Sequence, residues 1–189
     1  KKDIKESDYK AAFESYTPEV TAQIIKLDSE DKAKEVLEAA KAEGADFAQI
    51  AKDNSTDTAT KDKGGEVKFD SGTADIPSQV KEAAFKLDEN GISDVITVSA
   101  GQNYSASYYI VKLNKKTEKG SDWKKYEKRL KEIIVNGRKQ DTNYIRSIIA
   151  KAMTNANIKV KDDAFKSTFN QYLQNIGVQT SDSSSSSKK

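Results

Sequence analysis

The spacing of apolar residues in the first two thirds of the chain predicts short strands that alternate with helices. Val20–Leu27 is rich in β-branched residues and carries apolar side chains on both faces, which is typical of a central strand. Shorter strands are predicted at Glu66–Phe69, Val95–Val98 and Ser107–Leu113, the last two as a hairpin. This order of elements indicates an α+β domain built on a small antiparallel sheet.

Helical periodicity fills the intervals between the strands. A first helix is predicted over Asp3–Phe13, and later stretches place apolar residues three and four positions apart. Residues suited to helix ends stand beside these stretches: Asp28 or Ser29, Asp46 and Pro77 as starts, and Gly44 as a stop. The pairs Gly64-Gly65 and Asn90-Gly91 mark turns.

The composition changes near Ser121, where an all-helical pattern begins. Trp123, Tyr126, Leu130 and Ile133 share one helical stripe, and the residues after them continue it. A stripe of this kind is typical of the core between packed helices.

Farther on, a short amphipathic helix is predicted from the spacing of Phe165, Phe169, Tyr172 and Leu173. Ser181–Ser187 is too polar to bury a core and should be disordered. We therefore predict four segments: an N-terminal helical linker at 1–16, the α+β domain at 17–117, a helical extension at 118–176 and a disordered tail at 177–189.

The residue inventory narrows the chemistry. The chain has no His and no Cys, which excludes Ser-His-Asp and Cys-His catalysis, imidazole metal sites and disulfides. We expect no metal ion and no other cofactor. The net charge of +2 gives no reason to expect nucleic acid as a partner. No apolar run approaches the roughly 18–20 residues of a membrane span.

Sequence blocks in the order and spacing of a parvulin domain cover about Thr17–Lys116. They are GADFAQIAKDNSTD (Gly44–Asp57), KGGEVKF (Lys63–Phe69), VKEAAFKL (Val80–Leu87), GISDVITV (Gly91–Val98) and YYIVKL (Tyr108–Leu113). The chain therefore resembles the parvulins, which are peptidyl-prolyl cis/trans isomerases, or rotamases. The resemblance implies a four-stranded antiparallel sheet with flanking helices.

The segment NANIKVKDDAFKSTFNQYL (Asn155–Leu173) and the Ser-rich tail resemble the end of PrsA-type foldases. These are lipoproteins on the outer side of the Gram-positive cell membrane, where a lipidated Cys anchors them. Their C-terminal helices share a chaperone-like lobe with an N-terminal segment. The resemblance implies an extracytoplasmic location, a missing anchor and an incomplete lobe. The stripe with Trp123 and Leu130 is then expected to be uncovered and to favour self-association.

The parvulin active site can be followed residue by residue. Gln23, in Thr21-Ala22-Gln23-Ile24, stands where the family usually has its first His, and Tyr109 stands at the second. Asp57 matches the family's Cys or Asp. The residues that match the proline pocket are Val67, Phe69, Ile76, Val80 and Phe85. The segment after Val67 is shorter than usual, which reduces the aromatic wall.

These residues leave three functions open. The resemblance favours a foldase that binds prolyl segments of unfolded secreted proteins with weak or lost isomerase activity. In the alternative, a hydrogen bond between Gln23 and Tyr109 replaces the His pair and the enzyme is active. The third is a scaffold or adhesin-like surface module. Each residue also has a structural interpretation: Asp57 as a turn residue, Gln23 and Tyr109 as polar groups of the sheet, and Ile76 and Val80 as ordinary core.

Overall fold

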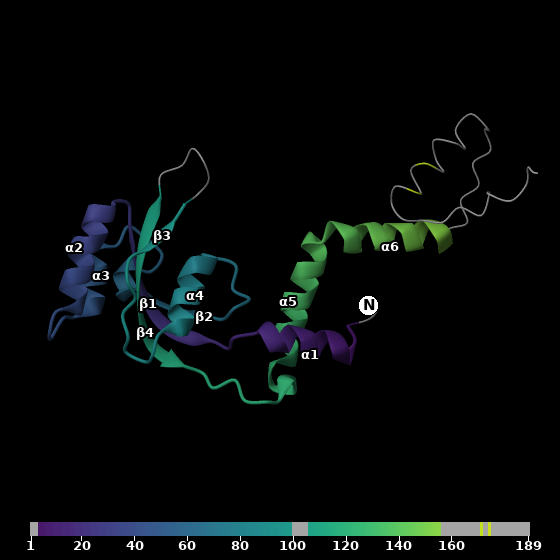
Figure 1. Ribbon diagram of the computed structural model, residues 1–189, viewed down its shortest axis with the longest axis horizontal. Helices are drawn as coiled ribbons and strands as arrows, with labels where there is room; N and C mark the ends of the chain where they lie inside the picture. Colours follow the sequence, from purple (N-terminus) through teal and green to yellow (C-terminus); the bar gives the residue numbers. More distant parts are fainter. Residues whose placement is uncertain (1–3, 100–105, 156–170, 172–173, 175–189) are drawn as a thin grey trace, which may run out of the picture. The chain divides into compact units, whose positions relative to one another are not determined.

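The computed structural model describes residues 4–99, 106–155, 171 and 174 of the 189-residue chain (Figure 1). The chain divides into two compact units. The sheet unit comprises Lys10–Lys125, and the helical unit comprises Lys1–Tyr9 with Tyr126–Lys189. The first helix, α1 (Glu6–Ser15), crosses this division. In the described residues, no helix combines the length and apolarity required to cross a membrane.

The sheet has four antiparallel strands in the order β2-β1-β4-β3. Their bounds are β1 Val20–Leu27, β2 Glu66–Phe69, β3 Ile96–Val98 and β4 Ser107–Lys116. The predicted central position of the first strand is confirmed, because β1 pairs with β2 on one side and with β4 on the other. The predicted hairpin is confirmed by the pairing of β3 with β4.

Two apolar clusters lie on opposite faces of the sheet, as the alternation in β1 predicts. Val20, Ala22 and Ile24 belong to the first cluster, with Val80 and Ala84 of helix α4 (Ser78–Lys86). Ile25 and Leu27 belong to the second cluster, which α2 (Glu30–Lys41) and α3 (Phe47–Asn54) cover. Figure 1 shows α4 on one side of the sheet and α2 with α3 on the other.

The helix starts agree with the predicted caps, and two boundary details differ. The Ser29 hydroxyl accepts a hydrogen bond from the Lys32 N–H, and the Asp46 carboxylate accepts one from the Gln49 N–H. Gly44, with φ of +75°, lies beyond the last helical residue, so it turns the chain rather than ending α2 directly. Pro77 is the N-cap of α4 rather than part of its first turn.

The helical unit contains α5 (Glu127–Gln140) and α6 (Thr142–Asn155), and the 3-10 turn Trp123–Tyr126 precedes α5. The expectation of an uncovered stripe is wrong for Leu130, whose exposed fraction is 0%. Among the described residues, the large apolar side chains that are exposed lie on α6 instead: Ile145, Ile148 and Ile149. The predicted helix with Phe165, Phe169, Tyr172 and Leu173 and the Ser-rich tail lie outside the described residues.

Candidate functional site

An apolar surface lies on the α4 side of the sheet, where the resemblance places the proline pocket. Val67, Ile76, Phe85 and Tyr109 are half-buried and pack against the first cluster. They come from β2, the loop before α4, α4 itself and β4. The sheet unit thus brings together apolar side chains that retain contact with solvent.

Two other predicted pocket residues lie beneath this surface. Phe69 and Val80 have exposed fractions of 2% and 0%, so they belong to the core. The Phe69 ring packs against Phe85, with the ring centroids 5.8 Å apart. Phe69 and Val80 therefore support Ile76 and Phe85 from below. The half-buried residues form the rim of the surface, and they are the ones that can face a ligand.

Gln23 and Tyr109 point to opposite faces of the sheet. Gln23 lies between Ala22 and Ile24, which both belong to the first cluster, and its Nε2 donates to the Gly64 carbonyl at 3.0 Å on the other face. Tyr109 packs against the first cluster and is paired with Lys26. The predicted hydrogen bond between Gln23 and Tyr109 therefore does not form, and this prediction is wrong.

Asp57 is held by its own loop. Its carboxylate accepts hydrogen bonds from the Ala59 N–H at 3.1 Å and from the Thr60 hydroxyl at 2.6 Å. Its backbone carbonyl accepts from the Lys61 N–H at 2.9 Å. Among the described residues, no hydrogen bond joins Asp57 to Gln23 or Tyr109. This geometry is that of an Asx turn, and it agrees with the structural interpretation of Asp57.

Beside Ile76, the loop that follows β2 contains a hydrogen-bond network that sequence reasoning missed. The loop begins at Asp70, whose carboxylate accepts from the Tyr16 hydroxyl at 3.0 Å and from the Gly72 N–H at 2.9 Å. Lys81 of α4 donates to the carbonyls of Ser71 and Thr73. The Asp-Ser-Gly sequence after the strand is a turn signal for the loop itself, but it does not indicate the partner Tyr16.

The structure offers no arrangement for a metal ion in its described part. Within residues 4–99 and 106–155, no group of three or more Asp and Glu side chains is placed to share one ion. Asp28 accepts a hydrogen bond from Thr56, and Glu30 pairs with Lys34 at 2.7 Å. These neighbouring acids of the α2 start therefore have structural partners.

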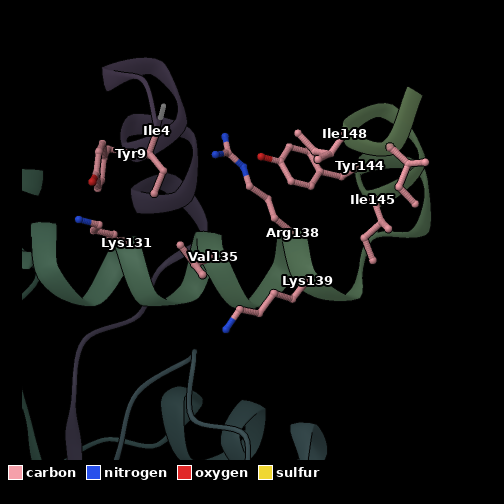
Figure 2. Close-up of a pocket in the computed structure, with 10 residues that line it drawn as sticks. Ile4, Tyr9, Lys131, Val135, Arg138, Lys139, Tyr144, Ile145 and Ile148 are labelled. Atoms are coloured by element: carbon pink, nitrogen blue, oxygen red, sulfur yellow. The ribbon is translucent and has the colours of Figure 1, made fainter. Parts of the chain in front are cut away.

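A second candidate site lies in the helical unit. It is a groove of about 650 Å³, and residues from the start of the chain and α1, from α5 and from α6 line it (Figure 2). Its apolar lining consists of Ile4, Tyr9, Val135, Tyr144, Ile145, Ile148 and Ile149, and its basic lining of Lys131, Arg138 and Lys139. A solvent-open groove of this composition suits an apolar segment with acidic flanks.

Arg138 organises one wall of this groove. It pairs with Asp8 at 2.7 Å, and its guanidinium lies 5.2 Å from the centre of the Tyr144 ring. In Figure 2 the Arg138 guanidinium lies between α1 and the Tyr144 ring. The ion pair joins the start of α1 to α5, so the N-terminal segment contributes to the helical unit, a contribution that no local sequence signal indicates.

The Asp8 carboxyl provides a pH test of this contact. The Lys5 N–H, which donates at 2.9 Å, and then Arg138 hold the pKa of Asp8 below its ordinary value of 3.8. The stabilisation is therefore present above that ordinary value and is lost as pH falls through the lowered pKa. We expect Arg138→Gln to move the Asp8 pKa part of the way back, because the Lys5 contact remains. An NMR titration that finds the same pKa in both proteins would contradict this.

The comparison with known families decides the identity of the sheet unit. Residues 16–115 match the rotamase model described as the PPIC-type PPIase domain. The chain belongs to the PPIC-type rotamase family. The match spans more than half of the chain, and it confirms the parvulin-like α+β fold predicted from the sequence blocks.

The similarity of this rotamase-family chain to known proteins extends beyond the rotamase domain. Foldase protein PrsA of Streptococcus sanguinis is 64% identical over 176 residues, which is 93% of this chain and 52% of the relative. The crystal structure of foldase protein PrsA from Streptococcus pneumoniae has a TM-score of 0.83 at 56% identity, covering 90% of this chain and 62% of that chain. The structure named peptidylprolyl isomerase PrsA from Bacillus cereus has a TM-score of 0.59 at 30% identity, covering 90% and 61%.

These matches confirm the resemblance to PrsA-type foldases. The chain spans about half to three fifths of the length of these three relatives. The activity, clients and location of the whole relatives are therefore only proposed for this chain.

Proposed function

We propose that this chain is part of an extracytoplasmic foldase that binds prolyl segments of unfolded secreted proteins. The observation that carries the proposal is the half-buried apolar surface of Val67, Ile76, Phe85 and Tyr109 in a rotamase-family domain. A prolyl ring is apolar, and contact with such a surface removes it from water. Affinity is expected to be weak, about 10 μM to 1 mM, because the surface buries little area and a flexible peptide must be ordered.

Isomerase activity is proposed to be weak or absent. Rotation of a prolyl amide faces a barrier of about 18–20 kcal/mol, and a catalyst lowers it by binding the twisted amide better than either planar isomer. Polar groups must then face the rotating carbonyl together. Gln23 and Tyr109 lie on opposite faces of the sheet, and the Asp57 carboxylate is occupied by Ala59 and Thr60. This arrangement supports binding without efficient turnover.

A protease-coupled assay with a prolyl peptide tests this proposal. We expect turnover near the uncatalysed rate, and little change in it for Asp57→Ala. NMR titration of the same peptide should still shift signals of Ile76 and Phe85. Robust turnover that Asp57→Ala abolishes would contradict the proposal and favour the active isomerase. A peptide that shifts no signal near Ile76 would exclude binding at this surface.

A second function is proposed for the helical unit. The groove that includes Ile145 and Ile148 exposes apolar area next to Lys131 and Lys139, and such a surface attracts a partner. We assign it to unfolded client segments that carry apolar and acidic residues. Self-association through the same α6 face is the competing use of this surface, and sedimentation at several protein concentrations distinguishes the two.

A further inference from the structure

The connection between α1 and β1 is fastened to the loop that follows β2. The Tyr16 hydroxyl donates to the Asp70 carboxylate at 3.0 Å, across 54 positions of sequence. Both residues are buried, with exposed fractions of 5% and 7%. The next residues repeat the contact: the Thr17 N–H donates to the Ser71 hydroxyl at 2.9 Å, and the Ser71 N–H donates to the Thr17 carbonyl at 3.1 Å.

The same Asp70 carboxylate shapes the loop internally. Its second oxygen accepts from the Gly72 N–H at 2.9 Å and from the Thr73 hydroxyl at 3.0 Å. Lys81 fastens the loop from the α4 side, donating to the Thr73 carbonyl at 2.6 Å. A buried polar network of this kind favours a single loop conformation, because breaking one bond leaves a desolvated group without its partner.

The loop leads directly to Ile76, on the rim of the apolar surface described above. Ile76 is half-buried and packs against the first cluster, while the backbone before it is fixed through Asp70 and Lys81. The position of the Ile76 side chain is thus set from two sides: from α4 itself and, through Asp70, from a residue outside the sheet and its helices.

We propose that Tyr16 is a positioning residue of the prolyl-binding surface, acting through Asp70 on the loop that carries Ile76. The proposal rests on the proposed function of that surface. In this role Tyr16 acts on the loop and holds it in the conformation that presents Ile76. The segment before β1 is therefore a working part of the binding surface and not only a linker.

The test compares Tyr16→Phe with the unchanged full chain. This substitution removes one hydroxyl and keeps the ring, so the packing of the side chain is preserved. We expect affinity for a prolyl peptide to fall about threefold to tenfold, the value of one hydrogen bond. Amide exchange should become about threefold to tenfold faster at Ser71 and Gly72, whose N–H groups belong to the network, and should be unchanged in α2.

Two control variants separate positioning from general stability. Tyr108→Phe removes a hydroxyl from the opposite face of the same sheet, where Tyr108 packs against the second cluster. Ala33→Gly destabilises the sheet unit through the fully buried Ala33 of α2. Both controls should leave the peptide affinity unchanged. Asp70→Asn, which keeps an oxygen for Gly72 and an amide for Tyr16, should retain more affinity than Asp70→Ala.

The outcomes distinguish this proposal from the proposed function. If the unchanged chain binds no prolyl peptide, the proposed function fails, and faster exchange at Ser71 and Gly72 in Tyr16→Phe still supports the control of the loop by Tyr16. If Tyr16→Phe leaves both affinity and exchange unchanged, the positioning role is overturned. If Ala33→Gly weakens binding as much as Tyr16→Phe, the effect is one of stability, and the positioning role is overturned as well.

Discussion

Gly65→Ala is expected to remove most of the stability of the sheet unit. Gly65 has φ of +78°, and a Cβ added there would lie 2.5 Å from the Ile24 carbonyl oxygen of β1. The Gly65 carbonyl also accepts a hydrogen bond from the Ile24 N–H at 2.8 Å. The contact is with backbone of a central strand, so a side chain cannot relieve it by rotating. We expect a loss of about 4 kcal/mol or more in the free energy of unfolding.

Gly44→Ala is the matched control, because the substitution and the backbone conformation are nearly the same. Gly44 has φ of +75°, but a Cβ there would meet nothing within 4 Å. Its expected cost is therefore only that of the left-handed conformation, about 1–2 kcal/mol. Urea unfolding followed by the NMR signals of β1 measures both variants. If both variants lose the same free energy of unfolding, the close approach of Gly65 to the Ile24 backbone does not explain the need for glycine at this position.

The strands of the sheet could be predicted because their signals are local. β1 has the predicted bounds Val20–Leu27, and its two faces follow from alternation within one strand. β2 also has its predicted bounds, since Gly64-Gly65 precedes it as a turn. Local signals fix the ends of the helices less closely: the sequence predicts Gly44 directly after α2, whereas Gly44 lies farther along the chain.

The relation of Gln23 to Tyr109 could not be predicted from a family pattern. Such a pattern assigns positions, but whether two positions share a face depends on the register between strands. In this sheet Gln23 is paired with Lys112 and Tyr109 with Lys26, so an odd number of positions separates Gln23 from Tyr109 across the pair. Odd separation places the side chains on opposite faces. Register is set by contacts far apart in sequence.

Contacts between distant segments also account for the other differences. Helical spacing predicts that Val80 faces the core side of α4. It does not distinguish a half-buried residue at the edge of the surface from a fully buried one such as Val80. The Asp8–Arg138 pair spans 130 positions, and the Tyr16–Asp70 bond spans 54. The resemblance implies only that an N-terminal segment shares the helical lobe, and no local pattern indicates either contact.

The two apolar surfaces are expected to have separable activities. Ile76→Asp should abolish detectable binding of a prolyl peptide, because a carboxylate replaces the apolar side chain against which we propose that the prolyl ring packs. Burying that charge without a partner costs several kcal/mol, which exceeds what a weak peptide complex can offset. Ile148→Asp should leave this binding unchanged, since Ile148 belongs to the groove of the helical unit.

The reverse result is expected when the same proteins are tested for suppression of client aggregation. Ile148 is 50% exposed, so Ile148→Asp places a charge in solvent and should cost little stability while it disrupts the apolar face of α6. Light scattering of an unfolding client should rise with Ile148→Asp and stay unchanged with Ile76→Asp. Circular dichroism and the NMR signals of β1 establish that each variant is folded. If Ile76→Asp abolishes both activities while remaining folded, clients bind through the sheet unit, and the groove of the helical unit has another partner.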